Sequence, residues 1–234
     1  YGGGCGAFVT GAAGYGFDLE KLADDIYDTL PRDAVLEATD FLEWWQKQKR
    51  DRYGLSDKAF ITVDVLKRLW RRSNPKITQL WPDVRRAAEH AVVTGEAIET
   101  RLLKFEKKGA WLRVRIASGR YLCYPHAEYD NDDGISYYGV DQYTRKWQKI
   151  RTHGSKIVEN IMQCSARCVL YDSMPTVEAA GFPIVLHVHD ELVTETEQDK
   201  HVEELSAIMA AGHSWTEGLP LAAAGFESLR YKKG

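Results

Sequence analysis

The sequence predicts an α+β protein with a helical first half and a second half in which antiparallel strands accompany two helices. Three observations lead to this prediction. Apolar residues recur at helical spacing as far as about residue 93, and they alternate with polar residues from about residue 111. In the run 184–195, two β-rich arms flank a His-Asp-Glu triplet. No Pro/Gly/Ser linker separates the two halves.

Four helices are expected in the first half, after a glycine-rich opening. Asp18 is a suitable N-cap for the first helix, whose apolar stripe ends at Pro31. The third helix should stop at Asn74-Pro75, because the residue before a proline disfavours helical backbone. The second, third and fourth helices are expected over 34–49, 62–72 and 77–93.

Strands and two helices are expected in the second half. Ser118-Gly119-Arg120 makes a turn between two strands. Strands are expected over 111–116, 121–124, 135–140 and 144–150, with a last one within 220–231. A long helix is expected within 154–180 and a shorter one over 197–211.

The segment 184–195 is the main candidate for chemistry. A hairpin here would hold Asp190 and Glu191 side by side at its tip, with His189 just before them. Carboxylates fixed on a stiff sheet suit a hard cation such as Mg²⁺, which indicates metal-assisted chemistry on phosphates. Two alternatives remain open: a merely solvated tip, and a zinc pair of His187 and His189 on one strand face.

Two further segments suit nucleic acid. Lys156, Asn160 and Gln163, followed by Arg167, recur on one face of the long helix, whose first amides can receive a phosphate. Arg145 lies in a stretch, 143–149, where basic and aromatic residues interleave. Such features suit groove and backbone contacts, although a solvated helix face and an ordinary edge strand have the same pattern.

Composition sets the outer limits. The formal net charge of −3 excludes a wholly basic protein but not local DNA-binding clusters. The four cysteines show no Cys-x-x-Cys spacing, so reduced thiols in a cytoplasmic setting are expected. No apolar run approaches membrane-spanning length and no signal peptide is visible, so no membrane partner is expected.

These signals occur in an order that resembles the C-terminal part of family A DNA polymerases, the DNA polymerase I-like group, and in particular its bacteriophage members. The resemblance extends through nearly the whole chain and is weakest between Pro31 and Phe60. It is carried by Val188-His189-Asp190-Glu191, which matches motif C, and by Val158-Glu159-Asn160-Ile161-Met162-Gln163, Ser118-Gly119-Arg120, Asn74-Pro75 and Tyr1-Gly2.

The resemblance implies a role for each matching residue. Asp190 would be one of two palm aspartates that bind the catalytic Mg²⁺ ions, and Glu191 would support it. His189 would approach the primer terminus, Gln163 and more weakly Asn160 would contact the duplex minor groove, and Tyr1 would stack near the template base. Lys156 stands near the position where the polymerase I branch has an arginine.

The resemblance also implies an incomplete polymerase fold. Residues 1–152 would be the C-terminal part of the fingers, and residues 153–234 would be the motif C half of the palm. The first palm aspartate, in a motif of the Asp-Tyr-Ser type, has no match, so an upstream polymerase fragment would have to supply it. The other partners would be primer-template DNA and deoxynucleoside triphosphates, in the cytoplasm of a bacterial or phage-infected cell. A non-catalytic DNA-binding subunit and a metal-dependent nuclease remain alternatives.

Overall fold

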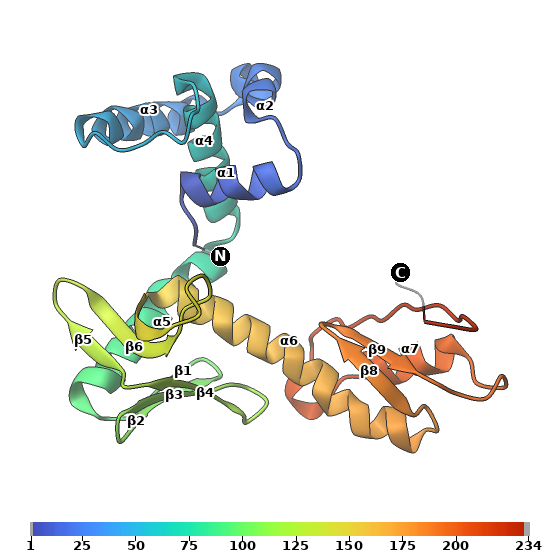
Figure 1. Cartoon of the computed structure of the whole chain (residues 1–234). Helices are drawn as coiled ribbons and strands as arrows, with labels where there is room; N and C mark the ends of the chain where they lie inside the picture. Colours follow the sequence, from blue (N-terminus) through green and yellow to red (C-terminus); the bar gives the residue numbers. More distant parts are fainter. Residues whose placement is uncertain (1, 232–234) are drawn as a thin grey trace. The chain divides into compact units, whose positions relative to one another are not determined.

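The structure, a computed structural model, describes residues 2–231 as helices and antiparallel sheets, which confirms the α+β prediction. The chain divides into two compact units. Unit 1 comprises the residues through Val84 together with Gly154–Lys156, and unit 2 comprises Arg85–His153 and the chain from Ile157 onward. Figure 1 labels their elements. The expected division into fingers (1–152) and palm (153–234) concerns polymerase subdomains and stays a prediction.

Unit 1 is helical. Helix α4 (Asp57–Ser73), the longest helix that lies wholly within the unit, supplies much of its core. Residues 59–65 of this helix are all buried, so they show no polar stripe, which is why the sequence pattern placed its start at residue 62. The Ser56 side chain caps the true start by accepting a hydrogen bond from the amide of Ala59. The helices are α1 (Cys5–Gly14), α2 (Leu19–Ile26), η1 (Tyr27–Thr29), α3 (Arg32–Lys47), α4 (Asp57–Ser73) and the first part of α5 (Pro75–Thr94).

Aromatic rings from α3 and α4 pack together in this core. The Phe41 ring lies 5.4 Å from the Trp45 ring and 6.2 Å from the buried Phe60 ring, centroid to centroid. Ring pairs at this separation add to the free energy of area burial. Asp18 caps α2 as predicted, and α4 ends at Ser73, directly before Asn74-Pro75.

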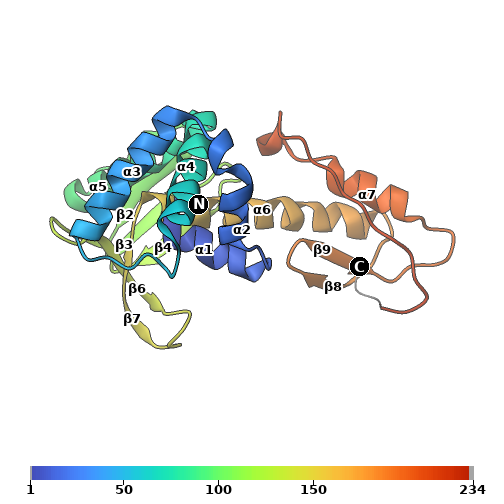
Figure 2. The same cartoon turned by 90° about the horizontal axis from the view of Figure 1, so that it is seen from above.

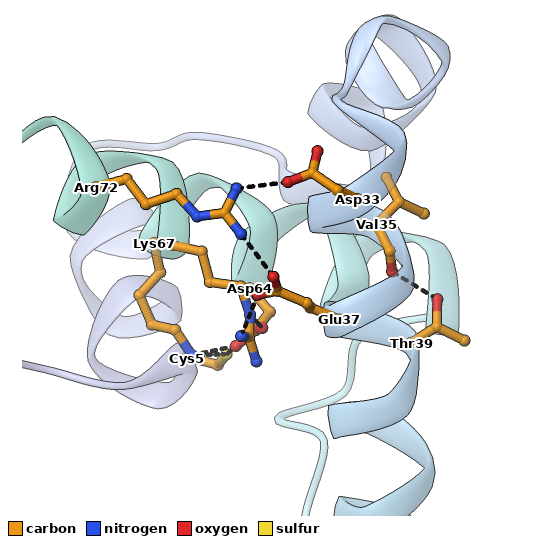
Figure 3. A network of polar contacts seen from close by, with 9 residues as sticks. Cys5, Asp33, Val35, Glu37, Thr39, Asp64, Lys67 and Arg72 are labelled. Atoms are coloured by element: carbon orange, nitrogen blue, oxygen red, sulfur yellow. Dashed lines mark hydrogen bonds and ion pairs between the residues drawn. The ribbon is translucent and has the colours of Figure 1, made fainter.

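A buried carboxylate connects α1 to α4. The Asp64 side chain is fully buried and forms ion pairs with Lys67 and Arg68 of its own helix. The Cys5 thiol, at the start of α1, donates a hydrogen bond to Asp64 Oδ1 at 3.5 Å (Figure 3). Burial raises the pKa of the Cys5 thiol to about 11, so this donor keeps its proton at neutral pH.

The same network extends to α3. Arg68 donates to Glu37 Oε2 at 2.9 Å, and Arg72 donates to Glu37 Oε1 at 2.7 Å and to Asp33 Oδ2 at 2.8 Å. Arg72 lowers the pKa of Asp33 from its ordinary value. The network therefore holds α3, α4 and α1 together around one buried charge.

Helix α1 was not predicted, because six of its ten residues are glycines or alanines and they leave no periodic apolar stripe. Its glycines lie in two different environments. A Cβ added at Gly6 would lie 2.7 Å from the Tyr53 ring, whereas one added at Gly11 would meet nothing within 4 Å.

We expect the substitution Gly11→Ala to stabilise unit 1 by about 1 kcal/mol, the difference between glycine and alanine inside a helix. Gly6→Ala should gain less or lose stability, because the Tyr53 ring must move. Urea unfolding followed by tryptophan fluorescence compares the two variants. Equal gains would contradict the packing of Tyr53 on α1.

Unit 2 contains three antiparallel sheets and the greater part of α6 (Gly154–Ala179). Sheet order is β1-β2-β3-β4 in the first, β5-β6-β7 in the second and β8-β9 in the third. The strands are β1 (Ile98–Thr100), β2 (Leu103–Lys108), β3 (Trp111–Arg115), β4 (Tyr121–Pro125), β5 (Glu128–Asp130), β6 (Gly134–Val140), β7 (Trp147–Thr152), β8 (Ile184–Val188) and β9 (Glu191–Thr194). Figure 2 shows the hairpin β6–β7 and, beside α6, the hairpin β8–β9.

Several boundaries differ from the predictions. Strands β1, β2 and β5 were missed, and β7 begins after a turn that occupies the first part of the expected 144–150 strand. Helix α7 (Val202–Ala210) is shorter than the expected 197–211, since His201 has extended backbone. The last strand expected within 220–231 is absent from these described residues; there the Glu227 carboxylate accepts from the amide of Val202 at 2.9 Å.

Candidate functional site

The hairpin β8–β9 is present, and its turn lies one residue earlier than expected. Val188 pairs with Glu191, so the two turn residues are His189 and Asp190. The prediction that Asp190 and Glu191 together form the tip was therefore wrong for Glu191, which begins β9. His189 takes the left-handed φ of +53° that a two-residue hairpin turn commonly requires.

This geometry leaves the carboxylates of Asp190 and Glu191 exposed at one end of the hairpin, with the His189 side chain also exposed. The hairpin is connected to α6 through His187, whose ring meets the Tyr171 ring edge-on at 5.4 Å. A rigid strand pair thus holds two adjacent carboxylates in solvent, where a ligand can reach them.

The donor types at the tip suit Mg²⁺, since a hard cation prefers carboxylate oxygens. Within residues 2–231, however, no three His, Cys, Asp or Glu side chains converge well enough to hold a metal ion. The carboxylates of Asp190 and Glu191 are therefore not by themselves a complete ligand set for a metal ion. The pair His187 and His189 likewise gains no third ligand from the described residues, so the zinc alternative has no support in the geometry.

The polar face of α6 contains both engaged and open side chains. Asn160 donates from Nδ2 to the Tyr124 hydroxyl at 3.1 Å, and Arg167 donates to the Tyr171 hydroxyl at 2.6 Å. The Gln163 side chain is exposed and forms no hydrogen bond with residues 2–231. Lys156 lies in the first turn, which belongs to unit 1. Of these residues, Gln163 is the one most available to a ligand.

Tyr124 was not anticipated as the partner of Asn160. Its side chain is buried on β4, its ring meets the Tyr137 ring edge-on at 5.0 Å, and burial raises the pKa of Tyr124 to about 12. Strand alternation over 121–124 placed Tyr124 on one sheet face but gave no sign of which helix would meet it.

This pKa predicts an alkaline loss of stability in unit 2. The folded-state pKa of Tyr124 lies above its ordinary value of 10.0, so its contribution is complete below pH 10 and is lost as the pH rises toward 12. A difference of about two pKa units corresponds to about 3 kcal/mol. We expect Tyr124→Phe to remove this component from urea unfolding measured between pH 8 and 11.5.

Tyr143→Phe, at an exposed tyrosine of the same unit, is the control and should leave the alkaline loss as in the unsubstituted chain. If Tyr124→Phe and the unsubstituted chain lose stability in parallel over this pH range, the burial of Tyr124 is not responsible.

Arg145 lies at the end of the hairpin β6–β7, in the turn that joins the two strands. Its backbone has a left-handed φ of +57°, and its amide donates to the Asp141 carbonyl at 3.0 Å. The side chain is exposed. Tyr1, the remaining candidate, lies outside the described residues.

The sequence did not indicate that the Asp172 side chain connects three parts of unit 2. It accepts from Arg120, at 2.6 Å, and from the indole of Trp215, at 2.9 Å, so α6 is connected to the β3–β4 turn and to η2 (Ser214–Thr216). The turn Ser118-Gly119-Arg120 was predicted from sequence. No sequence pattern indicated that Asp172, 52 positions after Arg120, would pair with it.

Fold and site together define an α+β protein with exposed carboxylates on a hairpin and a polar face on the neighbouring long helix. None of the helices in the described part of the chain combines the length and apolar character that a membrane span requires. Compared with known proteins, the chain is 38% identical over 175 residues to the DNA polymerase of Bacillus phage SP02. The match covers 72% of this chain and 27% of that polymerase, so the chain corresponds to about a quarter of the relative's length. No protein-family model and no solved structure matches the chain.

Proposed function

We propose that this chain is part of a template-directed DNA polymerase of family A, in which it supplies the motif C aspartate and contacts to primer-template DNA. The observation that supports the proposal most strongly is the 38% identity to a phage DNA polymerase over 175 residues, together with an exposed Asp190 on a hairpin turn. The reaction would join a deoxynucleotide to a primer 3′-hydroxyl and release pyrophosphate.

In this proposal Asp190 would bind catalytic Mg²⁺ and Glu191 would support it. Two-metal phosphoryl transfer uses ions about 3.5–4 Å apart, and bound Mg²⁺ would supply charge neutralisation for the attacking and leaving oxygens. A single hairpin offers too few carboxylates for such a site, so the remaining ligands would come from a polymerase segment outside these 234 residues. The lack of a three-ligand cluster among residues 2–231 is consistent with this division.

The DNA contacts would come from residues on several elements. Gln163 has the open amide on α6 that a minor-groove hydrogen bond requires, whereas Asn160 would have to share its amide with Tyr124. His189, adjacent to Asp190 in the turn, would approach the primer terminus. Lys156 and Arg145 would contact phosphates, and Tyr1 would stack near the template base. The chain would bind the deoxynucleoside triphosphate and the DNA inside the host cell.

Primer extension tests the proposal. The chain is mixed with the part of the phage SP02 polymerase that lies outside the region matched by this chain. If the two do not associate, the matching stretch of this chain replaces the corresponding stretch within the SP02 polymerase. Either form is the reconstituted enzyme. We expect Mg²⁺-dependent extension by the reconstituted enzyme and none by the chain alone. A folded reconstituted enzyme that binds primer-template DNA without extending it would contradict the proposal.

A non-catalytic DNA-binding subunit is the second candidate, and the exposed carboxylates argue against it. Asp190 and Glu191 would repel DNA phosphates unless a cation neutralised them. A subunit that only binds DNA therefore gains nothing from these two adjacent carboxylates at the end of the hairpin.

A further inference from the structure

The hairpin β6–β7 has two different faces. In its register Tyr138 pairs with Lys149 and Val140 pairs with Trp147, so these four side chains lie on one face. The opposite face includes Ile135 and packs into unit 2. Toward the end of the hairpin the first face is exposed at Val140 and Trp147, and Figure 2 shows this hairpin projecting from the neighbouring strands of its unit.

Aromatic side chains are unusually accessible at the end of this hairpin. Tyr143 is 93% exposed and Trp147 is 60% exposed. Val140, which pairs with Trp147 across the hairpin, is 56% exposed. Neither aromatic ring stacks on another ring among the described residues. Two large rings with open faces thus lie within a few residues of each other.

The net charge at this end is positive, because two cations accompany one carboxylate. The carboxylate of Asp141 is directed at its own turn, where it accepts from the amides of Tyr143 at 3.0 Å and Thr144 at 2.7 Å, and these bonds lower its pKa. Arg145 and Lys146, in contrast, form no ion pair with any residue that the structure describes. Two uncompensated cations therefore accompany the two rings.

The turn that presents them is well defined. The Asp141 amide donates to the Lys146 carbonyl at 2.9 Å, and the Arg145 amide donates to the Asp141 carbonyl at 3.0 Å. Farther from the turn, Lys149 is paired with Glu128 at 2.8 Å and Arg151 with Asp133 at 2.6 Å. The positive charge is therefore concentrated at the end of the hairpin and is neutralised toward its base.

We propose that Tyr143, Arg145, Lys146 and Trp147 form a platform that binds single-stranded DNA. Bases would stack on the rings of Tyr143 and Trp147, while Arg145 and Lys146 would neutralise the intervening phosphates. Single strands are favoured over duplex because only unpaired bases present open faces for stacking. The choice of DNA rests on the proposed function, in which the ligand would be the unpaired template ahead of the primer.

Binding of labelled DNA to the 234-residue chain tests the platform. Fluorescence anisotropy compares a 12-nucleotide oligothymidylate with a blunt duplex of equal length. We expect Tyr143→Ala/Trp147→Ala to weaken oligothymidylate binding by about tenfold or more, the usual effect of losing base stacking. Arg145→Gln/Lys146→Gln should make the salt dependence shallower by about 1.4 in log–log slope, for two lost phosphate contacts.

The β2–β3 hairpin supplies a matched control, since Lys108 and the 46% exposed Trp111 pair across its turn. Lys108→Ala/Trp111→Ala removes one cation and one exposed ring from the same unit and should leave both affinities unchanged. Circular dichroism spectra and unfolding midpoints show whether each variant keeps its fold.

Three results would overturn the platform: unchanged oligothymidylate binding by the platform variants, equal losses for single strand and duplex, or loss of association with the SP02 segment while DNA binding persists. The last result would indicate a protein contact. If the platform variants behave as expected but the reconstituted enzyme never extends a primer, the polymerase proposal falls and the platform stands. If the reconstituted enzyme extends primers normally but the platform variants bind single strands as well as the unsubstituted chain does, the platform falls and the polymerase proposal stands.

Discussion

Asp190→Asn is expected to reduce primer extension by the reconstituted enzyme at least about 10³-fold, which corresponds to about 4 kcal/mol of transition-state free energy. The substitution keeps the size of the side chain and removes the charge that would hold a catalytic Mg²⁺ ion. Because Asp190 is exposed in a hairpin turn, its replacement should not change the fold. Primer-template affinity should be retained or rise slightly, since an amide repels phosphates less than a carboxylate does.

Single-turnover extension and anisotropy on the same primer-template measure the two effects separately. Glu195→Gln, at an exposed carboxylate just beyond β9, is the control and should retain activity. Glu191→Gln should have an intermediate effect, as expected of a supporting group. Equal losses of extension and DNA affinity in Asp190→Asn would favour the DNA-binding subunit over the polymerase.

The second large effect is expected in unit 1, at the buried carboxylate of Asp64. Asp64→Ala leaves Lys67 and Arg68 without their buried partner and removes the acceptor of the Cys5 thiol. Breaking a buried ion pair by removing one partner typically costs about 3–5 kcal/mol. A loss of this size is a large part of the stability of a small domain, so unit 1 should unfold far earlier in urea, or fail to fold.

Asp24→Ala is the matched control, because the Asp24–Lys58 pair is solvent-exposed and such pairs contribute about 0–1 kcal/mol. Fluorescence of the tryptophans on α3 reports the packing of unit 1, and far-ultraviolet circular dichroism reports helix content when a variant does not fold. Comparable unfolding midpoints for the two variants would show that the Asp64 network contributes little.

The helices with clear start and stop signals were predictable from sequence. Asp18 as a cap and Asn74-Pro75 as a stop both lie where expected. Helix α1 was not predicted because most of its residues are glycines or alanines, which give no apolar periodicity. Strands β1 and β2 were not predicted because β1 is short and β2 is rich in charged residues, so alternation alone did not distinguish them from a loop.

The hairpin that carries the candidate site was predictable from sequence, but the contacts of the candidate residues were not. The apolar arms around His189 and Asp190 predicted the hairpin, while the exact turn position depends on which residue adopts positive φ. The bond between Asn160 and Tyr124 joins residues 36 positions apart, and no local pattern encodes such a pairing. Long-range packing decides it.

Single-nucleotide insertion by the reconstituted enzyme tests the central claim most directly. Four primer-templates that differ only in the first templating base are each offered one deoxynucleoside triphosphate at a time with Mg²⁺. The proposed function predicts insertion of the complementary nucleotide on each template, lost in Asp190→Asn. Insertion that ignores the templating base, or that survives Asp190→Asn unchanged, would contradict the assignment of this chain to a template-directed polymerase.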